Sequence, residues 1–199
     1  LREQESTQRT QAGLSELSEL LGSADIPQRI ECYDASHLMG TQAYVSMVVF
    51  DCGTPHPSHY RTFAIDERKG GDDYASLGNA LERRVARWQN DSELSPYDPR
   101  QDHSFARRPE VILIDGGAGQ LHAVKEALEP MIGEGTQVIA LAKEHEEIYT
   151  LDGEVIRLPG NSPARLMLQH ARDEAHRFAG KSHRKARSKQ ALQSVLDEI

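Results

Sequence analysis

Two aspartates end stretches of the chain that have the pattern of β-strands. Asp34 ends an alternating run that starts at Arg29, and Asp115 directly follows the apolar run Val111 to Ile114. If these runs are neighbouring strands, the two carboxylates face each other, and their repulsion raises the pKa of one unless a divalent cation lies between them. A hard ion with oxygen ligands, Mg²⁺ or Mn²⁺, fits such a pair, because it polarises a phosphodiester and lowers the pKa of an attacking water. The alternative is that each aspartate only caps the turn after its strand.

His176 is the third candidate for the same site. Leu166, Gln169 and Asp173 precede it at helical spacing, so one face of its helix carries both apolar and polar groups. If that face covers the sheet, His176 reaches the aspartates, where it can ligate the metal, accept a proton from water or protonate the leaving oxygen. The alternative is a structural histidine on a helix surface.

Two glycine-rich segments have both a structural and a functional interpretation. In Gly70-Gly71-Asp72-Asp73-Tyr74 the glycines make a turn and the aspartates cap a helix, or Asp73 is an outer ligand of the metal site. Gly116-Gly117-Ala118-Gly119-Gln120 follows a strand, but it lacks the spacing of a nucleotide-binding loop. The amides of Gly116 and Gly117 are instead candidates for holding a backbone phosphate at a helix N-terminus.

The charge of the chain is unevenly distributed. With 23 Lys and Arg against 31 Asp and Glu, the net charge of −8 excludes a protein that coats nucleic acid by its overall charge. Residues 165–189 nevertheless hold eight basic residues against two acids, which gives +6 there and leaves −14 for the rest. This segment is either a solvated helix face or a contact surface for a phosphate backbone. The proposed DNA-binding side chains in it are Arg177, Lys181, His183, Arg184, Lys185, Arg187 and Lys189.

The elements that must position these residues alternate between strands and helices. Apolar periodicity and turn residues predict strands over 29–34, 43–51, 59–65, 111–114 and 137–141, and a hairpin over 147–158. Helices are predicted over 10–21, 73–88, 120–131, 161–180 and 182–197, with a surface loop over 90–109. The order βββ-α-β-α-β is the ribonuclease H arrangement, an α/β fold with a mixed sheet of about five strands. In it, the strands that end in Asp34 and Asp115 are neighbours.

Composition and length indicate a globular protein with a buried core. The chain has 199 residues, 38% of them hydrophobic, and lacks the run of about 20 apolar residues that a membrane-spanning helix needs. We therefore expect a cytoplasmic and monomeric chain, and its start at Leu1 suggests a segment of a longer protein. Cys32 and Cys52 do not form a CxxC pair, and we expect each to be a core thiol.

Five motifs in order resemble one known family. They are 31–37 (ECYDASH), 70–74 (GGDDY), 113–121 (LIDGGAGQL), 173–179 (DEAHRFA) and 183–185 (HRK). Together they are similar to the C-terminal endonuclease domain of UvrC, the incision subunit of bacterial nucleotide excision repair. The match runs from about Pro27 to Ile199. The family often has Lys where Ala118 stands, the loop 90–109 is longer than usual, and 144–160 is shorter and divergent.

The resemblance implies a ribonuclease H-like endonuclease that cuts damaged double-stranded DNA on the 5′ side of a lesion. Its catalytic triad falls on Asp34, Asp115 and His176, and a further important aspartate falls on Asp73. In the family, the 3′ cut and the binding of UvrB belong to parts absent from this chain. We expect a helix and linker over 1–26, the endonuclease domain over 27–181 and a basic helix over 182–199.

Three hypotheses follow from these patterns. The first is a metal-dependent DNA endonuclease with Asp34, Asp115 and His176 at its centre. The second is a catalytically silent ribonuclease H-like module that docks DNA or UvrB, with the aspartates capping turns. The third, nucleotide binding at Gly116 to Gly119, has the weakest motif.

Overall fold

The computed structural model describes residues 2–38, 42–65 and 73–197, and it describes side chains over 4–36, 43–65 and 73–181. The strands are β1 (Arg29–Leu38), β2 (Gln42–Asp51), β3 (Thr54–Pro55), β4 (Arg61–Ile65), β5 (Val111–Asp115), β6 (Gln137–Ala142), β7 (Glu147–Thr150) and β8 (Val155–Ile156). The helices are α1 (Arg2–Leu20), a 3₁₀ turn (Pro57–His59), α2 (Asp73–Ser92), α3 (His103–Ala106), α4 (Ala118–Gly133) and α5 (Pro163–Asp197).

All the strands form one mixed sheet. Its order is β3-β2-β1-β5-β6-β7-β8, and β4 also pairs with β2. The pairs β1–β2 and β2–β4 are antiparallel, whereas β1–β5 and β5–β6 are parallel. The predicted ribonuclease H arrangement is therefore confirmed, since the first three long strands are antiparallel and the next two run parallel to the first. The predicted hairpin over 147–158 adds β7 and β8 at one edge.

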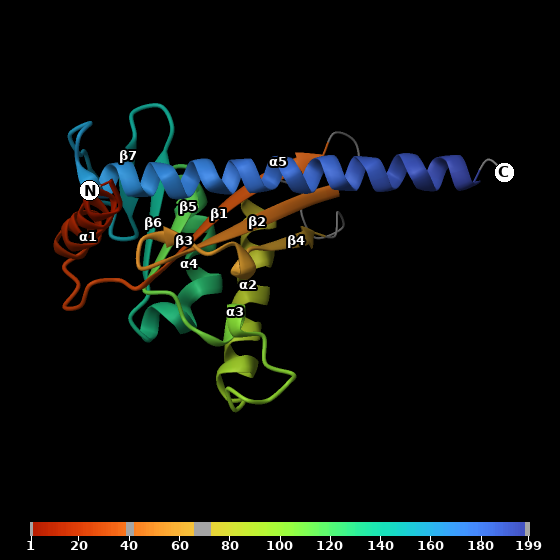
Figure 1. Ribbon diagram of the computed structural model, residues 1–199, viewed down its shortest axis with the longest axis horizontal. Coiled ribbons are helices and arrows are strands. Elements are labelled where there is room, and N and C mark those ends of the chain that lie inside the picture. The colour runs from red at the N-terminus through yellow and green to blue at the C-terminus, as the bar shows by residue number, and fades with distance from the viewer. Residues whose placement is uncertain (1, 39–41, 66–72, 198–199) are drawn as a thin grey trace.

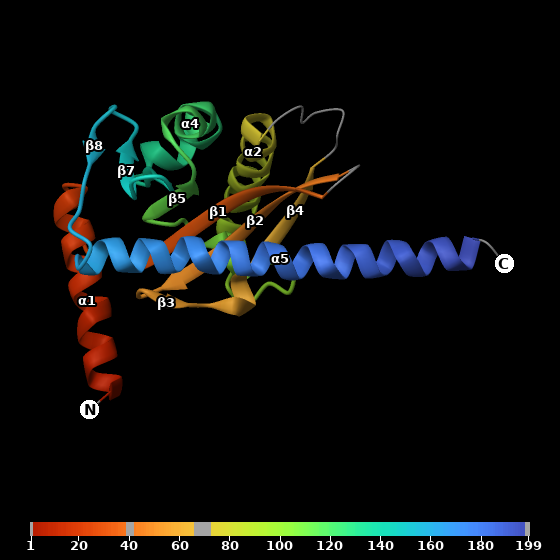
Figure 2. The same cartoon turned by 90° about the horizontal axis from the view of Figure 1, so that it is seen from above.

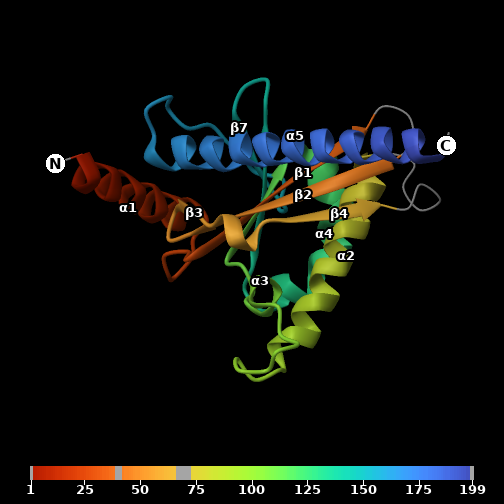
Figure 3. The same ribbon diagram turned by 45° about the vertical axis from the view of Figure 1, so that its right-hand side comes forward.

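Helices cover both faces of the sheet. In Figures 1 and 2, α5 lies across one face, and α2 and α4 lie side by side on the other. Figure 3 shows the same layers from a third side, with α1 meeting the N-terminal end of α5. Because side chains alternate along a strand, β1 contacts the helices on both faces of the sheet. Glu31 bonds to Arg84 of α2, whereas Asp34 bonds to His176 of α5.

A buried ion cluster joins the sheet to α2. Glu31 accepts hydrogen bonds from Arg84 Nη2 at 2.8 Å, from Arg29 Nε at 2.9 Å and from Tyr33 Oη at 2.6 Å. Burial alone would raise the pKa of Glu31, but the charges of Arg84 and Arg29 outweigh it and lower this pKa to about 2. Glu31 is therefore an anion inside the core, and its neighbours are arranged to keep it so.

Several predicted element boundaries were wrong. The first helix, predicted over 10–21, begins at Arg2 and ends at Leu20. β1 continues beyond Asp34 to Leu38, because β2 keeps pairing with it as far as Gln42. The predicted loop over 90–109 begins only after Ser92 and contains α3, whose N-cap Asp102 accepts a hydrogen bond from the Ser104 amide at 2.9 Å.

The two predicted C-terminal helices are one helix, α5, of 35 residues. Gly180 does not end it, because one glycine inside a helix costs only about 1 kcal/mol. The buried side chains of Ala175 and Ala179 hold that part of the helix on the molecule. The C-terminal part of α5 extends past the sheet (Figures 1 and 2).

α1 is packed as part of the core. Leu14 and Leu17 are buried in the same hydrophobic cluster as the sheet residues. Glu16 Oε2 accepts hydrogen bonds from Ser162 Oγ at 2.9 Å and from the Ala164 amide at 2.8 Å, so it caps the start of α5. The predicted boundary between 181 and 182 falls inside α5, and the division into three segments stays a prediction.

Two smaller expectations are also tested by the structure. Cys32 is buried, as predicted, but Cys52 is exposed, because it lies in the turn between β2 and β3 with a positive φ of 48°. Within the described residues, no helix is both long and apolar enough to cross a membrane.

Candidate active site

The pairing of β1 with β5 places the two aspartates side by side. The last parallel pair in the register is Tyr33 with Ile114, and the next residue on each strand is Asp34 and Asp115. Both side chains point to the face that α5 covers, and they are 8% and 6% exposed. Asp115 is the last residue of a strand that is buried throughout, so its carboxylate lies at the carboxyl edge of the parallel strands.

α5 brings His176 onto the aspartates. Its buried residues Leu168, Ala171 and Ala175 recur at helical spacing, and the small alanines let the helix approach the sheet closely. His176 Nδ1 lies 3.1 Å from Asp34 Oδ2, and His176 Nε2 lies 3.2 Å from Asp115 Oδ2. One possible ligand atom from each of the three residues lies within 4.8 Å of the others. The structure thus gathers the three residues that the sequence nominated.

The electrostatics of this cluster favour a bound cation. Burial, opposed by His176 and reinforced by Asp115, raises the pKa of Asp34 to about 6. Asp115 Oδ1 is buried and accepts no hydrogen bond from any described residue. A buried carboxylate oxygen without a partner is costly, and a divalent ion would satisfy it. Two carboxylates and one imidazole are a donor set that suits Mn²⁺ and, through the carboxylates, Mg²⁺. The residues present therefore fit a metal ion.

Lys143 also lies in the site, although the motifs did not nominate it. Its Nζ is 3.3 Å from Asp115 Oδ2, and its side chain is 63% exposed. β6 pairs with β5 so that Leu141 lies opposite Asp115, and Lys143 follows β6 at the same edge of the sheet. The signal in the sequence was a lysine two residues after the second predicted parallel strand, 137–141.

Asp73 lies outside the group of three. It is the first residue of α2, and the described residues that could share an ion are Asp34, Asp115 and His176. The neighbouring Tyr74 Oη lies 3.1 Å from where a Cβ on Gly119 would be, so α2 starts beside the first turn of α4. Gly70, Gly71 and Asp72 lie outside the described residues. The outer-ligand role of Asp73 stays a prediction.

The proposed phosphate contacts of Gly116 and Gly117 find no support in the hydrogen bonding. The Gly116 amide donates to Leu141 O at 3.3 Å, and the Gly117 amide donates to Gln120 Oε1 at 3.1 Å. Both amides are therefore engaged within the chain, and neither is free to hold a phosphate in this conformation.

The proposed DNA-binding side chains are described only at the start of their segment. Arg177 Nε donates to Glu174 Oε2 at 2.6 Å, so its charge is paired within α5. Lys181 is exposed. The side chains of His183, Arg184, Lys185, Arg187 and Lys189 lie outside the described residues.

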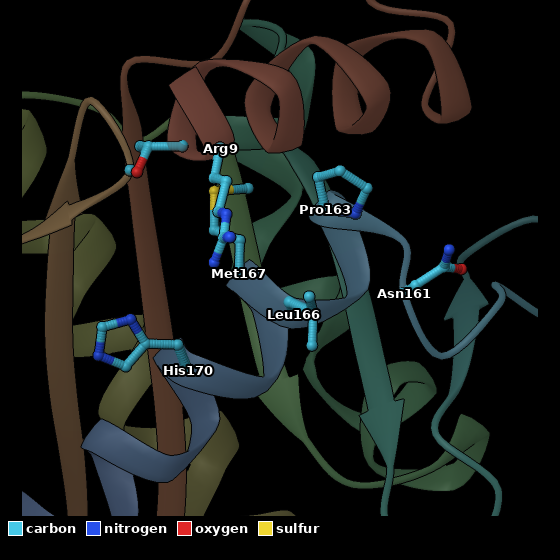
Figure 4. Close-up of a pocket in the computed structure, with 8 residues that line it drawn as sticks. Arg9, Asn161, Pro163, Leu166, Met167 and His170 are labelled. Carbon is cyan, nitrogen blue, oxygen red and sulfur yellow. The ribbon is translucent and has the colours of Figure 1, made fainter. Parts of the chain in front are cut away.

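A cavity of about 540 Å³ lies elsewhere, between α1, the β2–β3 turn and the start of α5 (Figure 4). Its lining residues are Arg9, Thr10, Gly53, Asn161, Pro163, Leu166, Met167 and His170. The triad residues are not among them. We therefore place the candidate active site at the aspartate pair and not in this cavity.

Comparison with known proteins identifies the family of the chain. A model of the UvrC RNase H endonuclease domain matches residues 18–179. The UvrABC system protein C of Dehalococcoides mccartyi is 49% identical over 187 residues, which are 94% of this chain and 30% of that protein. The protein of the same name from Mycolicibacterium smegmatis is 42% identical over 190 residues, 94% of this chain and 27% of that protein.

The chain spans about 30% of the length of these curated relatives. Among solved structures, the catalytic domain of human endonuclease V is similar with a TM-score of 0.43 at 12% identity, covering 90% of this chain and 95% of that one. At that TM-score the likeness says nothing about the reaction. The matched range covers most of the chain, and the positions of Asp34, Asp115 and His176 lie within it. This chain belongs to the UvrC RNase H endonuclease domain family.

Proposed function

We propose that this domain makes the 5′ incision of the damaged strand in bacterial nucleotide excision repair, by metal-dependent hydrolysis of a phosphodiester. One observation supports this most strongly: Asp34, Asp115 and His176 meet with possible ligand atoms within 4.8 Å of one another. The membership of the family supports the same reaction class, since its description is that of an endonuclease domain.

Each residue of the cluster has a role that its surroundings support. Asp34 and Asp115 would hold Mg²⁺ or Mn²⁺, and the ion when bound supplies Lewis acidity and a water of lowered pKa. Burial, with a smaller contribution from the charge of Asp115, raises the pKa of Asp34, so the charged form of Asp34 is unfavourable until a cation is bound. His176 contacts both carboxylates, so it can complete the donor set or take a proton from the attacking water.

The proposed step is an in-line displacement at phosphorus. A bond forms from the water oxygen to phosphorus, and the bond from phosphorus to the 3′ oxygen breaks. The water loses its proton to a base of the site, and the leaving oxygen gains one. The products are a 3′-hydroxyl and a 5′-phosphate.

Partners and location extend the proposal to the whole protein. The substrate is damaged double-stranded DNA, and UvrB is reached through parts of the protein outside this chain. We expect the isolated chain to be monomeric, to act in the cytoplasm, and to cut only weakly by itself. Robust lesion-specific incision by the 199 residues without UvrB would contradict the last expectation.

The test uses the complete protein with UvrB on an end-labelled duplex that carries one lesion. We expect Asp34→Asn, Asp115→Asn and His176→Ala each to lower the rate of the 5′ cut by at least about 100-fold, because each removes a group in direct contact with the reacting centre. The 3′ cut, made elsewhere in the protein, should remain and reports that the complex assembles. Asp152→Asn, at an exposed aspartate in the β7–β8 turn, is the matched control. If the 5′ cut survives all three site substitutions, the domain is the silent docking module instead.

A further inference from the structure

A short turn beside the triad carries two charged contacts. It joins β6 to β7 and consists of Lys143, Glu144, His145 and Glu146. Lys143 contacts Asp115 at one end of this turn, and Glu146 contacts Arg172 of α5 at the other. Building on the proposed function, we propose that Lys143 is a substrate-contact residue whose ammonium binds the scissile phosphate, and that the Glu146–Arg172 pair positions it.

The position of Lys143 suits a phosphate that approaches from solvent. Its side chain is 63% exposed, whereas the Asp115 carboxylate that it contacts is only 6% exposed. The ammonium thus lies on the solvent side of the acid pair, where DNA must arrive. A lysine ammonium has three N–H donors, so the contact with Asp115 leaves two for a non-bridging phosphate oxygen.

Charge balance gives a reason for a cation at this point. Asp34 and Asp115 already place two carboxylates at the site, and the phosphate adds further negative charge that grows during hydrolysis. The nearby arginines of α5 are engaged, since Arg172 pairs with Glu146 and Arg177 pairs with Glu174. The partner of Lys143 is a carboxylate of the site itself, so its charge acts where the reaction takes place.

The other end of the turn is fastened to the helix of the triad. Arg172 Nη1 lies 2.9 Å from Glu146 Oε2, and these side chains are 11% and 19% exposed. Arg172 precedes His176 by four residues, which is about one helical turn. Glu146 has a φ of 54°, a left-handed conformation that is uncommon for residues other than glycine. The pair therefore locks the turn that carries Lys143 to the helix that carries His176.

A purely structural role makes different predictions. If Lys143 only neutralised Asp115, its removal would change metal affinity or thermal stability and spare the reaction with metal in excess. An ion pair this exposed contributes little to stability. The decisive quantities are therefore the rate at saturating metal and the electrostatic contribution to DNA binding.

The experiment compares Lys143→Ala, Lys143→Arg and Lys125→Ala in the complete protein with UvrB and saturating Mn²⁺. Lys125 is an exposed lysine of α4 and controls for the loss of one positive charge. We expect Lys143→Ala to lower the single-turnover rate of the 5′ cut by about 10- to 100-fold. The 3′ cut and the Tm should not change, Lys143→Arg should restore most of the rate, and Lys125→Ala should match the parent. Glu146→Gln should give a smaller loss of the same 5′ rate.

A second readout needs no catalysis. With EDTA present, the plot of log Kd for duplex DNA against log salt should lose about 0.9 in slope in Lys143→Ala, the value for one phosphate contact, and nothing in Lys125→Ala. A 5′ rate within twofold of the parent, or a rate loss matched by a lower Tm, overturns the role of Lys143. If Asp34→Asn still cuts as well, the proposed function fails too. If Asp34→Asn is inactive while Lys143→Ala is fully active, only the Lys143 proposal fails.

Discussion

Asp34 combines burial with a proposed role in metal binding. Its side chain is 8% exposed, and it lies next to Asp115 and His176. Without a bound ion, a second buried carboxylate beside the first destabilises the folded state. The cluster therefore lowers the stability of the metal-free protein in return for a place to bind metal. This loss of stability can be measured by substituting one of the two carboxylates.

We expect Asp34→Asn to raise the Tm in EDTA by a few degrees, because it removes one of two neighbouring buried charges. Adding Mn²⁺ should raise the Tm of the parent, since the ion binds only the folded state, and should leave the Tm of the variant nearly unchanged. Differential scanning fluorimetry with and without Mn²⁺ checks both. Asp152→Asn is the control and should show the same rise in Tm with Mn²⁺ as the parent. If Asp34→Asn also shows the same rise, Asp34 is not a metal ligand.

At the scale of elements, side chains far from the reaction hold the helices on the sheet. Glu31 of β1 binds Arg84 of α2, and Arg84 Nη1 in turn donates to Phe105 O of α3 at 2.9 Å. Arg29 Nη2 donates to Ser104 O at 2.6 Å. One buried anion thus connects the central strand, α2 and α3. The opposite face of β1 is left free to carry Asp34.

We expect Glu31→Gln to lower the free energy of unfolding by about 3 kcal/mol at pH 7, because it leaves two buried guanidinium groups without their anion. Urea denaturation followed by circular dichroism measures this. Glu82→Gln, at an exposed position of α2, is the control and should change the free energy by less than about 0.5 kcal/mol. A Glu31→Gln protein as stable as the parent would show that the cluster contributes no net stability.

The same carboxylate sets a pH dependence. Its pKa in the folded protein is about 2, below the ordinary value of 4.5, so the folded state favours its charged form. The stabilisation is complete above about pH 4.5 and is lost as the pH falls towards 2. The difference in stability between the parent and Glu31→Gln should therefore be constant from pH 7 to pH 5 and should narrow below that. If the difference in the free energy of unfolding between the two proteins instead grows as the pH falls, the explanation from the pKa of Glu31 is wrong.

The contact between α1 and α5 makes a prediction at the same scale. Glu16 accepts two hydrogen bonds at the N-terminal end of α5, where a negative charge also interacts favourably with the helix dipole. Glu16→Ala should therefore lower the free energy of unfolding by about 1 to 2 kcal/mol. Glu19→Ala, at an exposed position of the same helix, should have little effect. Equal effects of the two substitutions would mean that the cap does not matter.

At the scale of the whole molecule, the net charge of −8 does not show which lysine and arginine side chains are paired within the domain. Arg165 Nη1 donates to Leu158 O, Arg172 pairs with Glu146, and Arg177 pairs with Glu174. These three arginines of the basic segment therefore serve the structure of the domain. Within residues 165–189, the charge available for a polyanion therefore begins at Lys181, which is exposed.

We expect simultaneous replacement of Arg184, Lys185, Arg187 and Lys189 by alanine to weaken binding of the complete protein to duplex DNA and to reduce the slope of log Kd against log salt by about 3 to 4. The reason is that each lysine or arginine at a phosphate releases about one counterion. Fluorescence anisotropy at several KCl concentrations measures the slope. Arg177→Ala should leave it unchanged, because that charge is already paired with Glu174. An unchanged slope in the fourfold variant would show that this segment does not contact phosphates.

The sequence by itself determined the strand order, the nomination of Asp34, Asp115 and His176, and the kind of ion they suit. Alternation, apolar runs and donor chemistry are local properties, so they can be read along the chain. It could not show that Lys143 reaches Asp115, that the amides of Gly116 and Gly117 are engaged, or that α5 is continuous.

Only the tertiary structure decided that Lys143 reaches Asp115 and that the Gly116 amide is engaged, because these contacts join residues distant in the chain. The register of β1 on β5 and the approach of α5 create the 3.1 Å and 3.2 Å contacts of His176. The same packing pairs Arg172 with Glu146, so the positive charge of Arg172 is used in an ion pair within the domain. The chemistry of the site was thus present in the residue types, whereas its charge balance arose from which side chains the fold brought together.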